Sequence, residues 1–307
     1  MHRLKPLFRL LLIGVLINMH YNHAIGEEEV RTWTSWVGSS IEAKFISLED
    51  GKVMLEQSNG NRKKVPLASL SEADRKAAQE LGARAEQNKL AAEAKETLAK
   101  LGLESGQQVR SVPEELRSSK TVASEYLLYL PEDYGSKSQR WPLVLFLHGA
   151  GERGDNINAI KKHGPPKLTP KKQFPFIRVS PQCRRDNWWN AKDLMQLIEE
   201  VQSMLQVDES RIYVTGLSMG GFGTWELITN YPDKFAAAIP ICGGAQADKA
   251  GRIADLPVWA FHGDKDTVVP VERVQDMVDS LKELNPDTFK FTLYENCGHD
   301  SWTRTYN

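Results

Sequence analysis

The sequence has little net charge, only three cysteines, and no internal repeat or low-complexity tract. Among its 307 residues, 39 Lys and Arg balance 40 Asp and Glu, which leaves a net charge of −1. This balance gives no electrostatic basis for binding nucleic acid or an anionic membrane surface. The spacing of Cys183, Cys242 and Cys297 indicates no metal site, and no cofactor is predicted. In an oxidising compartment a Cys242–Cys297 disulfide is sterically conceivable, but three free thiols are the expectation.

The sequence also has no hydrophobic run long enough to span a bilayer comfortably. Its N-terminal apolar run is short. Residues 10–17 are apolar, follow three basic residues, and precede the small-x-small stretch Ala24-Ile25-Gly26. This layout is typical of a secretory signal peptide, which we predict over residues 1–26. Because the apolar run is too short to span a bilayer comfortably, we predict a secreted or periplasmic protein without a stable membrane span. An uncleaved anchor is the alternative.

Two segments of different character follow the predicted signal peptide. Residues 27–70 contain short β-type runs with alternating faces, separated by the turn signals Glu49-Asp50-Gly51 and Ser58-Asn59-Gly60-Asn61. They predict a small β-barrel domain. Residues 71–104 start with a capping-box-like sequence and are rich in Ala, Glu, Lys and Gln. Because their large apolar residues form only a narrow stripe, we predict an exposed helical spacer.

Residues 105–307 alternate between strand-like and helix-like segments. This alternation predicts an α/β domain with a doubly wound, mostly parallel sheet that is covered on both faces. Residues 143–147 form a near-continuous apolar run, as expected for a strand buried on both faces. The predicted strands are 122–130, 143–147, 176–180, 211–215, 235–241, 258–261 and 289–294, and the predicted helices are 191–205, 220–230 and 271–284.

The motif Gly216-Leu217-Ser218-Met219-Gly220 lies between a strand-like and a helix-like segment. A sharp turn there exposes a serine hydroxyl at the top of a sheet, and the glycines leave room for the turn. An acidic residue, Asp264 or Asp266, and then His299 each follow a later predicted strand. This is the chain order of nucleophile, acid and base in one class of serine hydrolases. The sequence therefore predicts that chemistry, with Ser218 as nucleophile and His299 as base.

Further residues are predicted around this group. The backbone N–H groups of Met219 and of Ala150, in a glycine-rich turn, are expected to bind the oxyanion of the intermediate. Exposed aromatic residues in loops often contact ligands, sugars included, although at least one of two adjacent tryptophans could serve in packing. His148 and His262 are expected to be structural, and His163 to lie on the surface. The candidate substrate-binding residues are Glu152, Arg153, Trp188 and Trp189.

Six motifs in order carry a family resemblance from about residue 121 onward. They are 130–134, 147–154, 180–183, 216–221, 262–270 and 298–302. This segment resembles the α/β-hydrolase serine esterases of the phospholipase/carboxylesterase and feruloyl-esterase-like group, some of which are labelled predicted peptidases. In that group the acid stands directly before x-Val-Val-Pro, which favours Asp266 over Asp264. The group's members also usually end in a helix over the sheet, whereas this sequence stops at Asn307.

The resemblance implies a metal-independent enzyme that cleaves carboxylic esters through a Ser-His-Asp acyl-enzyme mechanism. Its substrates would be esters, including acyl groups carried on polysaccharides. A prolyl-oligopeptidase-like serine peptidase uses the same intermediate and is the first alternative. A binding protein with a catalytically inactive hydrolase domain is the second.

The N-terminal β segment carries a second resemblance. It is similar to the SH3-like Sla-type homology domain in Arg31-Thr32-Trp33, Ala43-Lys44-Phe45, Leu48 to Val53, and Val65-Pro66-Leu67. This resemblance implies a non-catalytic interaction module whose ligand the sequence does not identify. A β extension that packs on the enzyme is the alternative.

Overall fold

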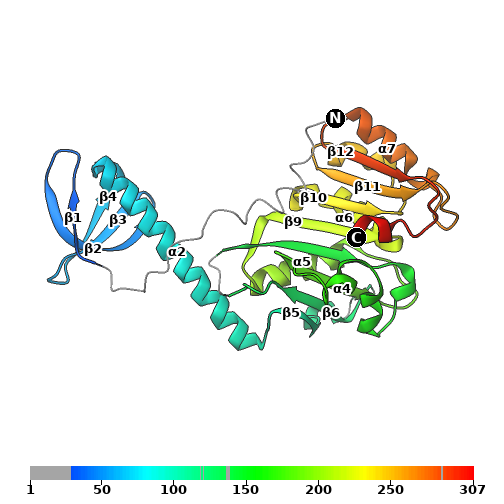
Figure 1. Cartoon of the computed structure of the whole chain (residues 1–307), viewed down its shortest axis with the longest axis horizontal. Helices are drawn as coiled ribbons and strands as arrows, with labels where there is room; N and C mark the ends of the chain where they lie inside the picture. The colour runs from blue at the N-terminus through cyan, green and yellow to red at the C-terminus, as the bar shows by residue number, and fades with distance from the viewer. Residues whose placement is uncertain (1–28, 118, 120, 136–138, 285) are drawn as a thin grey trace. The chain divides into compact units, whose positions relative to one another are not determined.

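The computed structural model describes residues 29–307 except 118, 120, 136–138 and 285. The predicted signal peptide lies outside these residues, so export stays a prediction from the sequence. The contacts divide the chain into two compact units, Met1–Ala92 and Glu93–Asn307 (Figure 1). Within the described ranges, every helix is too short or too polar to span a bilayer.

The first unit is a small β domain, as predicted, followed by the start of a long helix. Its four strands form an antiparallel meander around the buried side chains of Trp33, Phe45 and Leu55. The hairpin glycines Gly51 and Gly60 have φ values of 69° and 81°, which residues with a Cβ rarely adopt. The strands are β1 (Arg31–Thr34), β2 (Ser40–Glu49), β3 (Lys52–Glu56) and β4 (Arg62–Pro66), followed by the short helix η2 (Leu67–Ser69).

Helix α2 (Glu72–Leu101) differs from the predicted exposed spacer because both of its ends are packed. At its start, the carboxylate of Asp74 accepts the N–H of Thr34 at 2.8 Å. Ala78 is fully buried in the core of the first unit, and Ala94 is fully buried in the core of the second. Small alanine side chains thus anchor a helix whose large apolar residues are few.

The second unit contains an eight-stranded sheet in the order β12-β11-β10-β9-β7-β8-β6-β5. Neighbouring strands from β12 to β8 are parallel, whereas β6 is antiparallel to both β8 and β5. All seven predicted strands are present. Strand β5 was not predicted, because it is a polar strand at the edge of the sheet and has no apolar run. The strands are β5 (Gly106–Ser111), β6 (Val122–Leu130), β7 (Trp141–Leu147), β8 (Ile177–Cys183), β9 (Val207–Leu217), β10 (Ala237–Ile241), β11 (Val258–Gly263) and β12 (Phe289–Tyr294).

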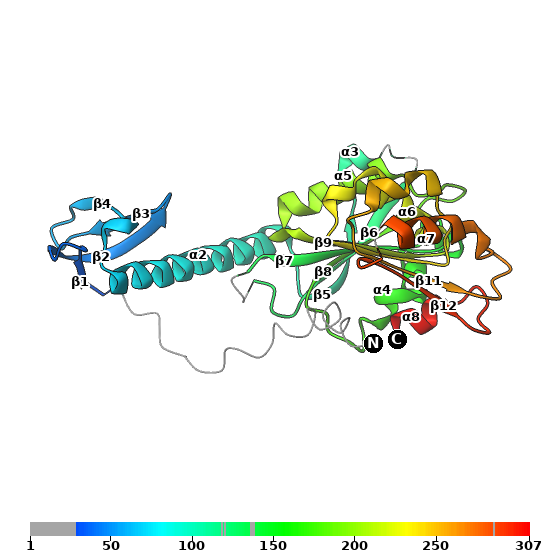
Figure 2. The ribbon, with the colours of Figure 1, turned by 90° about the horizontal axis from the view of Figure 1, so that it is seen from above.

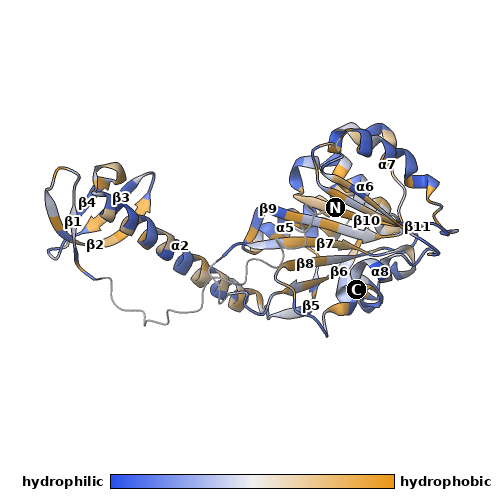
Figure 3. Cartoon of the chain, turned by 45° about the horizontal axis from the view of Figure 1, so that its top comes forward, coloured by the Kyte–Doolittle hydropathy of each residue, from blue (hydrophilic) through white to orange (hydrophobic). Residues whose placement is uncertain are grey.

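Helices cover both faces of this sheet. Figure 2 shows α5, α6 and α7 on one side and α4 and α8 on the other. Hydrophobic residues gather along the central strands, where the main core lies under α5, α6 and α7 (Figure 3). The α-helices are α3 (Glu114–Arg117), α4 (Gly164–Leu168), α5 (Ala191–Met204), α6 (Met219–Asn230), α7 (Glu272–Leu284) and α8 (Trp302–Tyr306). The 3₁₀ helices are η3 (Ala150–Glu152), η4 (Ile157–Lys162), η5 (Pro232–Lys234) and η6 (Ala247–Ile253).

The parallel strands bring distant loops to one edge of the sheet. Strand β7 ends at Leu147, β9 at Leu217, β11 at Gly263 and β12 at Tyr294. In open α/β sheets, ligands bind outside the carboxyl ends of the strands. The loops that follow these four strands carry most of the predicted site residues.

Candidate active site

Ser218 occupies a tight turn between β9 and α6. Its backbone has φ 54° and ψ −118°, a conformation that side chains with a Cβ rarely adopt and that presents the hydroxyl at the sheet edge. The flanking glycines are required by close backbone approach. A Cβ on Gly216 would lie 2.3 Å from the carbonyl oxygen of Gly220, and a Cβ on Gly220 would lie 2.0 Å from that of Leu147. Helix α6 therefore begins in direct contact with the end of β7.

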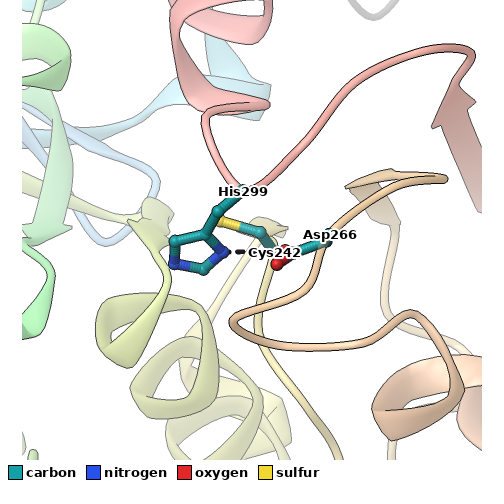
Figure 4. A group of neighbouring side chains, drawn as sticks. All are labelled: Cys242, Asp266 and His299. Carbon is teal, nitrogen blue, oxygen red and sulfur yellow. Dashed lines mark hydrogen bonds and ion pairs between the residues drawn. The ribbon is translucent and has the colours of Figure 1, made fainter.

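His299 reaches Ser218 from the loop after β12. The Oγ atom of Ser218 lies 2.8 Å from Nε2 of His299. On the other side of the ring, Nδ1 lies 2.7 Å from Oδ2 of Asp266, in the loop after β11 (Figure 4). The partners fix the tautomer: the serine hydroxyl donates to Nε2, and the Nδ1–H donates to the carboxylate. The structure thus brings together three side chains that are far apart in the sequence.

The acid in contact with the imidazole is Asp266 and not Asp264. The Oδ1 atom of Asp266 accepts the backbone N–H groups of Val268 and Val269 at 2.9 Å each, and the residue is only 6% exposed. These bonds leave Oδ2 directed at His299. Asp264 is exposed and accepts the N–H of Cys297, a hydrogen bond that lowers the pKa of Asp264.

The predicted oxyanion-binding loop after β7 passes beside the nucleophile. A Cβ on Gly149 would lie 3.6 Å from Cβ of Ser218. In the part of the chain that the structure describes, the backbone N–H groups of Ala150 and Met219 have no acceptor within the protein. Met219 is the first residue of α6, where helix geometry leaves the N–H free. Both groups are therefore available to a ligand oxygen.

A buried histidine holds this loop in place. His148 donates its Nδ1–H to the carbonyl of Gly149 at 2.6 Å, and its Nε2 accepts the N–H of Cys183 at 2.9 Å. Burial lowers the pKa of His148 to about 4, so the ring is neutral at physiological pH. The indole of Trp189 packs on the ring edge-on, and its Nε1–H donates to the carbonyl of His148 at 3.2 Å. His148 is structural, as expected from the sequence.

The four candidate substrate-binding residues have different surroundings. Trp188 is 58% exposed and packs edge-on against Phe222, whereas Trp189 is only 3% exposed and packs in the interior. Arg153 donates from Nε to the carbonyl of Ala150 at 3.1 Å, so it braces the loop after β7. Glu152 is buried at the end of the same loop. Trp188 therefore offers a surface to a ligand, while Trp189 takes the packing role that the sequence left open.

Cys242, Asp266 and His299 bring a sulfur, a carboxylate oxygen and a ring nitrogen within 4.8 Å of one another (Figure 4). This donor set does not fit a resident metal. Both ring nitrogens of His299 are engaged, one with Ser218 and one with Asp266. Burial raises the pKa of Cys242 to about 12, and a metal prefers the thiolate. All three cysteines are free and buried.

Two further histidines, His262 and His163, lie close to the three side chains of the site. The Nε2–H of His262 donates to the carbonyl of Val269 at 2.8 Å and lies 3.4 Å from Oδ2 of Asp266. Burial lowers the pKa of His262, which favours the neutral ring and supports a structural role. His163 differs from the surface position expected for it, since its half-buried ring packs edge-on against Trp302. Sequence spacing gave no signal for the His163 contact, because its partner is distant in the chain.

The sheet and the tight turn at Ser218 define the second unit as an α/β-hydrolase domain, the fold class predicted from the sequence. Residues 184–306 match the Dienelactone hydrolase family. Residues 24–85 match SLA1 homology domain 1, which confirms the predicted N-terminal domain type. The two matches thus fall on different parts of the chain, the first within the second unit and the second over the N-terminal β domain.

The second unit is similar to esterases. The probable feruloyl esterase C of Aspergillus niger is 25% identical over 187 residues, which cover 59% of this chain and 69% of that protein. The bifunctional acetylxylan esterase/xylanase of Neocallimastix patriciarum is 26% identical over 170 residues, 51% of this chain and 23% of that protein. The crystal structure of a thermostable esterase is 33% identical with a TM-score of 0.52, over 65% of this chain and 59% of that one. The domain is thus an esterase-like hydrolase, and the chain spans less than two thirds of the last two proteins.

Proposed function

We propose that the protein is a serine esterase that hydrolyses carboxylic esters through Ser218, His299 and Asp266. One observation carries the proposal: the continuous chain from Oγ of Ser218 to Nε2 of His299 at 2.8 Å and from Nδ1 of His299 to Asp266 at 2.7 Å. Such a chain activates a hydroxyl that is otherwise a weak nucleophile. Similarity to esterases supports an ester as the bond that is cleaved.

In the first half of the proposed reaction, Oγ of Ser218 attacks the carbonyl carbon of the ester and its proton moves to Nε2 of His299. As negative charge develops on the carbonyl oxygen, the free N–H groups of Ala150 and Met219 donate hydrogen bonds to it. Each such donor is worth about 3 kcal/mol in the transition state of comparable enzymes. His299 then protonates the leaving alkoxide, and the acyl group stays on Ser218.

In the second half, His299 takes a proton from water, and the resulting hydroxide attacks the acyl carbon. Collapse of this second intermediate breaks the bond between the acyl carbon and Oγ, and His299 returns the proton to Ser218. In both halves the imidazole passes through its charged form. The carboxylate of Asp266 stabilises that charge and keeps the proton of the neutral ring on Nδ1.

A fluorophosphonate probe tests the proposal directly. We expect the folded protein to be labelled on Ser218, because the activated hydroxyl attacks phosphorus as it attacks an acyl carbon. Mass spectrometry of the labelled peptide identifies the serine, and Ser218→Ala is the unlabelled control. Folded protein that takes up no label contradicts the proposal and favours the binding-protein alternative. Faster cleavage of peptide p-nitroanilides than of p-nitrophenyl esters would favour the peptidase alternative.

We further propose acyl groups on polysaccharides as the substrates. The names of the feruloyl esterase and acetylxylan esterase relatives support this class. The exposed indole of Trp188 supports it as well, because Phe222 packs edge-on at 5.7 Å and holds it in place. A fixed aromatic face with 58% exposure is a surface on which a sugar ring can stack.

Replacing Trp188 with alanine should therefore raise KM for an acetylated or feruloylated oligosaccharide by roughly fivefold to tenfold, the loss of about 1 kcal/mol of stacking. Hydrolysis of p-nitrophenyl acetate, which has no sugar, should change little. Steady-state kinetics with both substrates measures the difference. Trp36→Ala is the matched control, since Trp36 is 74% exposed in the other unit. An unchanged KM for the oligosaccharide would exclude Trp188 as a sugar contact.

A further inference from the structure

Three side chains that the proposed mechanism does not use lie between the loop after β7 and the loop after β12. They are Glu152, His163 and Trp302, and they form what we call the His163 bridge. The first loop carries the N–H of Ala150, and the second carries His299. The proposed chemistry requires that both loops keep a fixed position relative to Ser218.

The first end of the bridge is the carboxylate of Glu152. Its Oε2 accepts the N–H of Gly149 at 3.1 Å, directly before Ala150. Its Oε1 lies 3.7 Å from Nε2 of His163. The carbonyl of Glu152 accepts an N–H from the buried Gln182 at 2.8 Å, which fixes its backbone. Glu152 thus connects the backbone beside the predicted oxyanion hole to the imidazole of His163.

His163 is the centre of the bridge. Its Nδ1 accepts the Nε1–H of Trp302 at 3.3 Å, so the ring proton is on Nε2 and faces Glu152. Burial lowers the pKa of His163, which favours this neutral form. The next residue, Gly164, has φ 61°, and a Cβ there would lie 2.5 Å from the ring of Phe146. The backbone at His163 is therefore fixed against the sheet.

The second end of the bridge is Trp302, the first residue of α8. Its ring packs edge-on against His299, with centroids 5.3 Å apart and an interplanar angle of 87°. Helix α8 is itself anchored, because the hydroxyl of Tyr306 lies 2.8 Å from Oγ1 of Thr215 in β9. Trp302 therefore packs against the ring of His299 from a fixed position.

We propose that the His163 bridge positions the imidazole of His299 and the N–H of Ala150 relative to each other, with His163 as the positioning residue at its centre. This inference rests on the proposed function, since it assigns roles within that site. His163 contacts neither Ser218 nor, in the proposed reaction, the substrate. Its contacts with Glu152 and Trp302 link chain segments that are separated by more than a hundred residues and that meet only in the fold.

The test is a set of variants assayed by kcat and KM per active site, with active sites counted by fluorophosphonate titration. His163→Ala should lower kcat by roughly tenfold to a hundredfold with little change in KM, because small displacements of catalytic groups cost about that much. His163→Asn keeps an acceptor for the Trp302 N–H but loses the contact with Glu152, so its kcat should lie between that of His163→Ala and that of the wild type. Lys171→Ala, a change of an exposed residue beyond α4, is the control.

A double-mutant cycle tests whether His163 acts through Trp302. Trp302→Phe keeps an aromatic ring beside His299 but has no N–H to donate to His163. If His163 acts through Trp302, the fold decrease in kcat of the double variant His163→Ala/Trp302→Phe should be smaller than the product of the fold decreases of the two single variants. A decrease for the double variant that equals this product would show that the two residues act independently, and it would overturn the proposal.

The outcomes separate this inference from the proposed function. If Ser218→Ala keeps its activity, the proposed function fails. If Ser218→Ala is inactive while His163→Ala keeps the wild-type kcat per titrated site, only the bridge fails. A purely structural role predicts fewer titratable sites and a lower Tm at an unchanged kcat, and that result would also overturn the proposal.

Discussion

Ser218→Ala is expected to lower kcat for ester hydrolysis by roughly 10⁵-fold or more, as loss of a triad nucleophile does in related chemistry. The physical reason is that the attacking oxygen, the one hydrogen-bonded to Nε2 of His299, is removed. KM should change little, because the free N–H groups of Ala150 and Met219 remain. Steady-state kinetics with p-nitrophenyl esters measures the effect.

The control for this substitution is Ser203→Ala, which removes the hydroxyl of an exposed serine at the end of α5. It should be as active as the wild type. Undiminished ester turnover by Ser218→Ala would exclude the proposed mechanism. Circular dichroism of both variants should match the wild type, since neither substitution empties a core position.

The second large effect is expected for Asp266→Asn, with a fall in kcat of about 10⁴-fold, as for the equivalent change in a serine protease triad. The amide keeps the size of the side chain but loses the negative charge. It favours the wrong tautomer of His299, because an amide N–H directed at Nδ1 requires the ring proton to move to Nε2. The imidazole then cannot accept the proton of Ser218.

Asp264→Asn is the matched control, because Asp264 lies two residues away and is exposed. Its loss should change kcat by less than about threefold, since its hydrogen bond to Cys297 can be kept by the amide oxygen. A large loss for Asp264→Asn together with a small loss for Asp266→Asn would exchange the two assignments.

Ser218, Asp266 and His299 could be predicted from the sequence because each of them belongs to a local sequence pattern. Ser218 lies in a motif whose glycines are required by backbone contacts within a few residues and with the end of β7. Asp266 and His299 each follow a recognisable strand, and parallel strands end at a common edge. The sheet was predictable for the same reason, since buried strands are marked by apolar runs.

Other features depend on contacts that no local pattern records. His163 gave no signal because its partners are Glu152 and Trp302, which the fold alone brings to it. The adjacent Trp188 and Trp189 differ only in the direction each side chain takes, so the sequence could not tell the exposed one from the buried one. Helix α2 was read as exposed because Ala78 and Ala94 add little to an apolar stripe, yet both are fully buried.

The contacts around Gly216 and Gly220 have a consequence for how such an enzyme can diversify. Carbonyl oxygens, and not flexible side chains, occupy the space that an added methyl group would need at either position. Repacking cannot relieve such a clash, so even alanine there would have to shift the strand end or the helix start. The two glycine positions beside the nucleophile therefore tolerate almost no substitution during evolution. New specificities would instead have to arise in the surrounding loops, such as the one that carries Trp188, where a changed side chain meets solvent.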